Sequence, residues 1–175
     1  MKALILLASL CWFIFSCSPS TPSVGGASSG EKLSASELGS AFFDHYQKRD
    51  DWTGFLERYD ENVEFIDVIL RMKLEGVEEF AAFYNWPDTG FQKHPDFPST
   101  LVLEELTLND STAVGRGYFN PFYYRGILYD DMDHMRFTMS LTFNEAGKIV
   151  RHVDFIEYPP EILQSVAERL LAENE

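Results

Sequence analysis

The chain has 175 residues, 45% of them hydrophobic and 15% aromatic, and a formal net charge of −14 at pH 7. A surface this acidic repels the phosphates of nucleic acids and the headgroups of anionic lipids, which excludes nucleic-acid binding. The sequence also shows no nucleophile elbow and no phosphate-cradling loop, so hydrolase and nucleotide-binding functions have no support.

The N-terminal residues have the pattern of a secretory signal. Lys2 precedes an apolar run over 3–15, which ends just before Cys17. The run is shorter than the roughly 20 apolar residues of a membrane-spanning helix. Residues 14–17, with the letters IFSC, resemble a bacterial lipobox, whose cysteine is diacylated and becomes the new N-terminus. Cleavage by an ordinary signal peptidase near Ala27 is the alternative.

A flexible tether is predicted after this cysteine. Eleven of the thirteen residues at 18–30 are Ser, Thr, Pro or Gly, a composition typical of a linker that reaches about 20 Å. Cys11 is lost with the signal, so the mature domain has no disulfide. We therefore expect a signal at 1–16, an acylated cysteine and tether at 17–33, and one domain at 34–175. Two acyl chains hold a protein stably on a membrane, which predicts a cell-envelope location, on the outer membrane of a Gram-negative bacterium.

Three helices are predicted in the first half of this domain. The first begins at a capping box formed by Ser34 and Glu37 and continues with apolar residues at helical spacing. The second is predicted at 52–59, with Asp51 as its N-cap, and the third at 77–86, where a proline follows.

Strands dominate the rest of the domain. A loop is predicted at 87–100 and a final helix at 161–172. Helices followed by a run of antiparallel strands give an α+β fold. Apolar runs bounded by turn residues predict strands at 63–70, 101–108, 112–119, 134–143 and 147–158.

Three segments have the order and spacing of a known superfamily. They are an acidic turn and strand ending in Asp at 60–67, a glycine before a helix at 76–84, and a Phe, turn, Gly, basic, Ile pattern at 143–150. On these segments the chain resembles the nuclear transport factor 2-like superfamily, which includes SnoaL-like polyketide cyclases and steroid ketoisomerases. The resemblance implies a cone-shaped α+β fold, with a curved, mostly antiparallel sheet, N-terminal helices packed in its concave face, and a pocket between them. Enzymes, binders and scaffolds share this fold, so it does not fix a function.

The resemblance also implies candidate catalytic residues. Asp67 falls where the steroid isomerases keep the carboxylate that moves a proton beside a carbonyl. Asp154 falls where SnoaL-like cyclases carry their acid/base carboxylate in a His-x-Asp strand, and His152 matches the histidine of that strand. Phe43 and Met139 take the positions of the isomerase's oxyanion donors, and neither can donate a hydrogen bond. This departure argues against steroid isomerase chemistry.

Each of these residues has a structural alternative. Asp67 can be an exposed strand-end acid that caps a turn, whereas in an apolar pocket its pKa would rise toward the range useful for proton transfer. His152 and Asp154 share one face of their strand, because side chains two apart point the same way. A register shift of one residue would put them on the solvated side. The resemblance favours the pocket side, with Val153 and Phe155 on a convex side that serves as a dimer surface in such folds.

A mostly apolar pocket is expected around these residues. Gly115 and Gly117 either bend their strand or leave space for a ligand. The aromatic-rich segment at 119–134 is expected to form a rim over the pocket or to pack on a partner subunit. The acidic run at 130–134 diverges along a hairpin, so no metal site is expected. The residues expected to contact the ligand are Phe43, Tyr46, Phe65, Trp86, Gly115, Gly117, Phe119 and Met139.

The sequence thus predicts an envelope lipoprotein whose SnoaL-like domain binds a small, mostly apolar molecule without a cofactor. Its chemistry would be acid/base proton transfer of the isomerase or cyclase kind, with Asp154 or Asp67 as the base and His152 orienting the substrate. The alternative is a non-catalytic binding or assembly module, such as a homodimer, that uses the convex face of the sheet.

Overall fold

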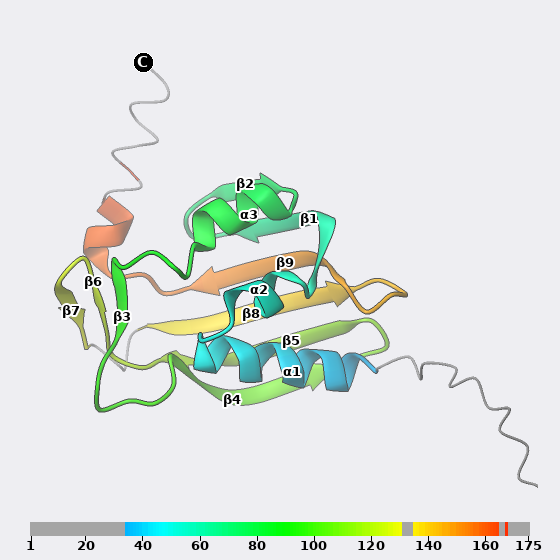
Figure 1. Cartoon of the computed structure of the whole chain (residues 1–175), viewed down its shortest axis with the longest axis horizontal. Coiled ribbons are helices and arrows are strands. Elements are labelled where there is room, and N and C mark those ends of the chain that lie inside the picture. The colour runs from blue at the N-terminus through cyan, green and yellow to red at the C-terminus, as the bar shows by residue number, and fades with distance from the viewer. Residues whose placement is uncertain (1–33, 131–134, 165–166, 168–175) are drawn as a thin grey trace, which may run out of the picture. The chain divides into compact units, whose positions relative to one another are not determined.

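A computed structural model describes residues 34–130, 135–164 and 167 (Figure 1). The helices are α1 (Ala35–Lys48), α2 (Trp52–Leu56) and α3 (Val77–Tyr84). The strands are β1 (Tyr59–Asp67), β2 (Met72–Glu75), β3 (Phe91–Lys93), β4 (Leu101–Leu108), β5 (Thr112–Phe119), β6 (Phe122–Tyr124), β7 (Ile127–Tyr129), β8 (Arg136–Phe143) and β9 (Ile149–Ile156).

The predicted α+β architecture is confirmed. A curved six-stranded sheet has the order β2-β1-β9-β8-β5-β4, and the three helices lie on one of its faces. A smaller three-stranded sheet, in the order β3-β6-β7, lies at one end of the large sheet. All strand pairs of the large sheet are antiparallel except β1 with β9, which is parallel. The core therefore lies between the helices and one face of this sheet.

Helix α1 begins at the predicted capping box. The Glu37 amide donates to Ser34 Oγ at 3.3 Å, and the Ser34 amide donates to Glu37 Oε2 at 2.8 Å. Both donors would otherwise lack a partner at the helix start. The face of α1 that carries Phe43 and Tyr46 is buried and packs on β4 and β5. The cap thus fixes where the helix begins and which side chains it turns toward the sheet.

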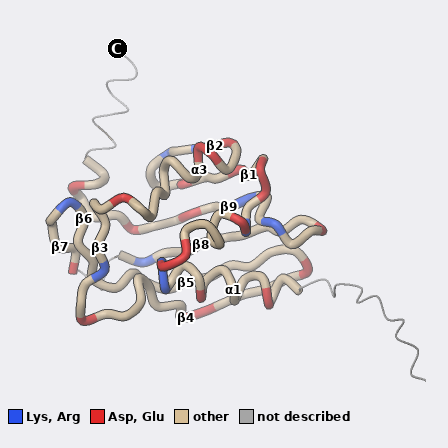
Figure 2. The backbone as a smooth tube through the Cα atoms, viewed as in Figure 1, with Lys and Arg blue, Asp and Glu red and all other residues tan. Residues whose placement is uncertain are grey.

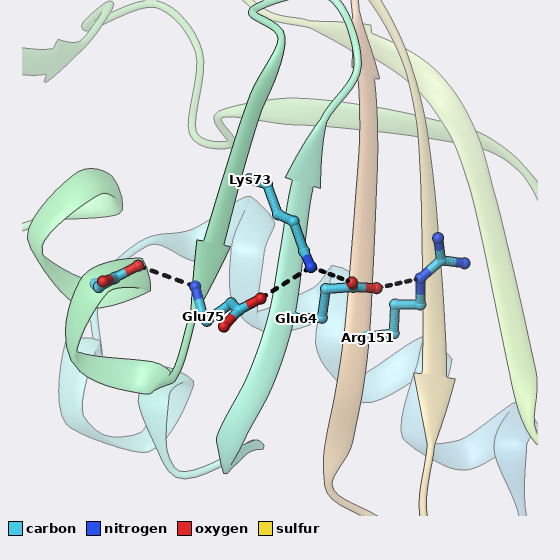
Figure 3. Close-up of polar contacts among 5 residues, drawn as sticks. Glu64, Lys73, Glu75 and Arg151 are labelled. Carbon is cyan, nitrogen blue, oxygen red and sulfur yellow. Dashed lines mark hydrogen bonds and ion pairs between the residues drawn. The ribbon is translucent and has the colours of Figure 1, made fainter.

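The outer face of the sheet carries an ion-pair network at the β1–β9 junction. Glu64 lies between Lys73 and Arg151, at 3.0 Å from Lys73 Nζ and 2.7 Å from Arg151 Nε (Figure 3). Lys73 also contacts Glu75 at 2.9 Å. Exposed ion pairs contribute about 0–1 kcal/mol each. Burial of the opposite face, rather than this network, therefore supplies most of the energy that holds these strands together.

Most predicted elements are present with shifted ends. Strands β4 and β5 have the predicted bounds. The helix predicted at 52–59 is shorter than expected, because Tyr59 already belongs to β1. Strands β2 and β3 are not among the predicted strands, because each has only three or four residues, and β3 lies within the loop predicted at 87–100. The helix predicted at 161–172 begins at residue 160, and most of its length lies outside the described residues.

Protein atoms fill the space beside the two glycines of β5. A Cβ on Gly115 would lie 2.1 Å from the Phe43 ring, and one on Gly117 would lie 1.9 Å from the Val102 carbonyl oxygen. The pairing of β4 with β5 is irregular next to Gly117, as at a β-bulge. The irregular pairing fits the predicted bend at Gly117, whereas the Phe43 ring and the Val102 carbonyl occupy the space expected for a ligand beside the two glycines.

Acidic side chains outnumber basic ones, with 28 Asp and Glu against 14 Lys and Arg in the chain. Figure 2 shows the acidic residues spread over the strands, helices and turns of the described part. No helix in that part is long and apolar enough to cross a bilayer. The signal, Cys17 and tether predicted at 1–33 lie outside the described residues.

Candidate functional site

Parallel pairing of β1 with β9 brings the three predicted acid/base residues together. Asp67 pairs with Asp154, and Phe65 pairs with His152. All three polar residues lie on the helix-covered face, with exposed fractions of 0% for Asp67 and His152 and 1% for Asp154. Phe155, on the opposite face, is 49% exposed. The strand register therefore turns the His-x-Asp pair inward.

His152 is packed among aromatic rings. Its Nδ1 lies 3.0 Å from the Tyr59 hydroxyl, and its Nε2 lies 2.8 Å from Asp154 Oδ1. The contact between Nε2 and Oδ1 is short but not aligned as a hydrogen bond, and neither atom hydrogen-bonds to another described residue. The rings of Phe42 and Phe65 stand edge-on to the imidazole, with centroids 5.5 and 5.2 Å away. Packing and the Tyr59 contact thus hold the imidazole beside Asp154.

A tyrosine hydroxyl covers each carboxyl group. Tyr84, the last residue of α3, donates to Asp154 Oδ2 at 2.6 Å. Tyr158, just beyond β9, donates to Asp67 Oδ2 at 2.5 Å, and the Leu70 amide donates to Asp67 Oδ1 at 2.8 Å. Among the described residues, neither acid pairs with a lysine or arginine. The hydrogen bonds to both acids therefore come from tyrosine hydroxyls and one backbone amide, and Asp154 also lies beside His152.

Burial shifts the pKa values of this group of side chains. It raises the pKa of Asp67 above its ordinary value of 3.8, against the hydrogen bonds from Leu70 and Tyr158, which lower it. Burial also raises the pKa of Tyr84, and the neighbouring Asp154 raises it further. The pKa of Tyr158 is raised by burial and then by Asp67. The two tyrosines therefore keep their protons and remain donors at physiological pH.

A cavity of about 300 Å³ lies next to these tyrosines. Tyr46, Tyr84 and Tyr158 line it, whereas the three buried acid/base residues do not. Tyr84 and Tyr158 thus line the cavity and also hydrogen-bond to the two carboxyl groups. The rest of the lining is mainly apolar or aromatic and includes Leu70, Phe91, Phe119, Met135 and Ile156, together with one basic side chain among the described residues, Arg49.

The structure places two of the predicted ligand contacts in the cavity wall and the others outside it. Tyr46 and Phe119 line the cavity. The others lie outside it because aromatic rings from the helices fill the neighbouring part of the sheet face, as the 4.0 Å between the centroids of Phe55 and Trp86 shows. The predicted ligand contacts that do not line this cavity are Phe43, Phe65, Trp86, Gly115, Gly117 and Met139.

Arg49, Tyr84 and Tyr158 are among the cavity residues that were not predicted as ligand contacts. Tyr158 lies at even spacing from Asp154, so the alternation along this strand could have included it. Tyr84 follows Phe80 by four residues and shares its helix face. Arg49 gives no such signal, because its position depends on the left-handed end of α1, where its φ is 51°.

The acidic run predicted at 130–134 lies mostly outside the described residues. In the part of the chain that the structure describes, no three His, Cys, Asp or Glu side chains are grouped as a metal site requires. The candidate site described above is made of tyrosines, two carboxyl groups, one histidine and one arginine.

Solved structures share this fold, whereas no protein-family model and no curated protein sequence matches the chain. A candidate SnoaL-like polyketide cyclase from Shewanella putrefaciens CN-32 is 18% identical with a TM-score of 0.55, over 89% of this chain and 97% of that one. An NTF-2 like protein of unknown function from Burkholderia xenovorans LB400 is 14% identical with a TM-score of 0.51, over 71% and 84%. TerC, co-crystallized with polyporic acid, is 19% identical with a TM-score of 0.53, over 77% and 98%. The chain therefore has the nuclear transport factor 2-like fold that the resemblance implies.

Proposed function

We propose that this chain binds a small, mostly apolar molecule in the cavity lined by Tyr46, Tyr84 and Tyr158. One observation carries the proposal: a cavity of about 300 Å³ has mainly apolar walls, and buried carboxyl groups hold two of its tyrosine hydroxyls. Apolar walls with a few fixed polar groups are typical of small-molecule sites. The similarity to TerC, which was crystallized with polyporic acid, supports a ligand of this kind.

The same geometry supports cofactor-independent proton transfer. The Tyr84 hydroxyl donates a hydrogen bond to Asp154 Oδ2. The lone pairs of the Tyr84 oxygen therefore stay available to a ligand in the cavity. A ligand O–H or C–H gives its proton to Tyr84 while the tyrosine proton passes to Asp154, and the ligand keeps the electron pair of the broken bond. Return of the proton to a different ligand atom completes an isomerisation. His152 and Tyr59 keep Asp154 in place, and Asp67 is arranged in the same way behind Tyr158.

Binding is tested by calorimetric titration of the full chain with β-naphthol, a flat and neutral aromatic alcohol. Met135→Trp places extra volume in the cavity and is expected to abolish saturable binding. Thr138→Trp is the matched control, because it adds a ring three residues along the chain, in β8 and at the opposite face of the sheet. Absence of binding to the unmodified chain, or loss of binding only in the control variant, would contradict the proposal.

Proton transfer is tested separately from binding. The α-hydrogens of β-tetralone, an aromatic ketone of similar size, exchange in D₂O at a rate that NMR measures directly. The unmodified chain is expected to accelerate this exchange, and Tyr84→Phe is expected to remove the acceleration because it removes the oxygen that receives the proton. Equal exchange rates with the unmodified chain and with Tyr84→Phe would contradict proton transfer through Tyr84, while the binding function would stand.

The envelope location is part of the proposal. Lys2, the apolar run at 3–15 and the letters IFSC at 14–17 support a lipoprotein signal, with the tether at 18–30 carrying the domain away from the membrane. Mass spectrometry of the protein from membranes is expected to find a diacylated Cys17 at the N-terminus. An unmodified N-terminus near Ala27 would refute the anchor.

A second candidate function is assembly through the outer sheet face. Phe155 and Ile69 are 49% and 40% exposed, and both line a groove of about 520 Å³ on this face. If two copies pair there, sedimentation analysis would find a dimer that Phe155→Ser converts to a monomer. A monomer in both cases would exclude a homodimer at this face.

A further inference from the structure

We propose that the ligand of the cavity carries one anionic group, which pairs with Arg49. This inference rests on the proposed binding function and specifies the chemical class of the ligand as a flat, largely apolar acid. It begins from a guanidinium group that lines the cavity and forms no ion pair with an acidic side chain of the described residues.

Arg49 is held in place by its backbone and by aromatic rings, and its guanidinium makes no hydrogen bond to the residues that the structure describes. Arg49 is the C-cap of α1 and has the left-handed conformation, and its backbone amide donates to the His45 carbonyl at 3.0 Å. The guanidinium carbon lies 3.9 Å from the centroid of the Phe91 ring and 5.3 Å from that of Trp86. An arginine stacked on aromatic faces keeps the N–H groups at its edge for a further partner. The stacking thus orients the group while leaving its donors to a ligand.

The three arginines of the large sheet are paired. Arg116, Arg136 and Arg151 each contact a glutamate on the outer face. Arg58, Arg71 and Arg125 form no ion pair with a described carboxylate either, but among the described residues Arg49 is the basic side chain that lines the cavity. Burial lowers the pKa of Arg49, as expected for a cation withdrawn from water, although a guanidinium stays protonated in proteins. An anionic ligand group would supply the missing partner.

The buried carboxyl groups do not occupy this position. Asp67 and Asp154 are engaged by Tyr158 and Tyr84, and neither acid lines the cavity. The titratable side chains that interact with Arg49 are Tyr46 and Tyr84, whose raised pKa values keep both hydroxyls neutral at physiological pH. The cavity therefore offers a cation and tyrosine hydroxyls joined by aromatic and apolar walls, which fits an acid group on a flat apolar body.

The test compares β-naphthoate with β-naphthamide, which have the same ring system but differ in charge. Calorimetry with the full chain is expected to show the acid binding about tenfold or more tightly than the amide, the range for a charge-assisted contact. Arg49→Gln should reduce this preference to about equal affinity. Arg125→Gln is the matched control, since Arg125 also has a left-handed φ, of 49°, and lies 5.4 Å from the Tyr124 ring, but does not line the cavity.

The outcomes separate this inference from the binding function. Equal affinity of the unmodified chain for both compounds, or an unchanged preference in Arg49→Gln, would overturn the anionic ligand while cavity binding stands. An equal loss of preference in Arg125→Gln would attribute it to long-range charge and would also overturn the pairing. Failure of both compounds and of β-naphthol to bind would overturn both proposals.

Discussion

Tyr84→Phe removes one hydroxyl from the centre of the site and keeps the ring. The ring of Tyr84 stacks on Phe80 with centroids 4.6 Å apart, and the substitution leaves that contact intact. What is lost is the 2.6 Å hydrogen bond to Asp154 Oδ2, while Oδ1 of the same acid has no aligned donor among the described residues. Asp154 is 1% exposed, so solvent does not replace the lost donor.

A buried polar group without its partner costs about 1–3 kcal/mol. For a domain of this size, about 2 kcal/mol corresponds to a decrease of about 4 to 8 °C in melting temperature. Circular dichroism of the full chain measures this change. Tyr118→Phe is the matched control, because the Tyr118 hydroxyl makes no hydrogen bond to a described residue and lies on the other sheet face. Equal melting temperatures for the two variants would refute the role given to the Tyr84–Asp154 contact.

Three further predictions concern the acid, the glycines and the helix cap. Burial raises the pKa of Asp67 above 3.8, so the folded state holds the proton of this carboxyl group more tightly than the unfolded chain does. The contribution of the protonated Asp67 to stability is therefore complete below pH 3.8 and is lost as pH rises through the raised pKa. Asp67→Asn should therefore lower the pH dependence of the melting temperature above pH 3.8, and parallel curves for the two proteins would contradict this. Gly115→Ala places a Cβ 2.1 Å from the Phe43 ring and should lower the free energy of unfolding in urea by about 1–3 kcal/mol, whereas Gly90→Ala, whose nearest contact would be 3.4 Å, should cost less. Ser34→Ala removes the side-chain cap of α1 and should cost about 1 kcal/mol in the same assay, and an unchanged midpoint would show that the cap is not needed.

Much of the fold could be predicted because its signals are local. The capping box at Ser34, the alternation along 134–143 and the turn before β9 each depend on neighbours in sequence. Strand β2 has four residues and lies at the sheet edge, where only one neighbouring strand imposes a pattern. Short edge strands therefore leave little trace in the sequence.

The site could be predicted only in part. His152 and Asp154 stand out because two polar residues alternate with apolar ones on a buried strand, and the resemblance adds Asp67. The residues of the cavity walls could not be predicted in this way, since the rings that fill the space beside the sheet come from helices distant in sequence. Phe43 occupies the space beside Gly115, and nothing in the local sequence separates this packing from an open pocket.

The central claim is that the cavity beside Tyr84 and Tyr158 is the ligand site, and tyrosine ring NMR tests it most directly. With ¹³C in the tyrosine rings of the full chain, the signals of the carbons that bear the hydroxyls are followed during titration with β-naphthol. The signals of Tyr84 and Tyr158, which line the cavity, are expected to shift together and to saturate, while that of Tyr118 on the outer face stays constant. A shift confined to Tyr118, or no saturable shift at Tyr84 and Tyr158, would contradict the account.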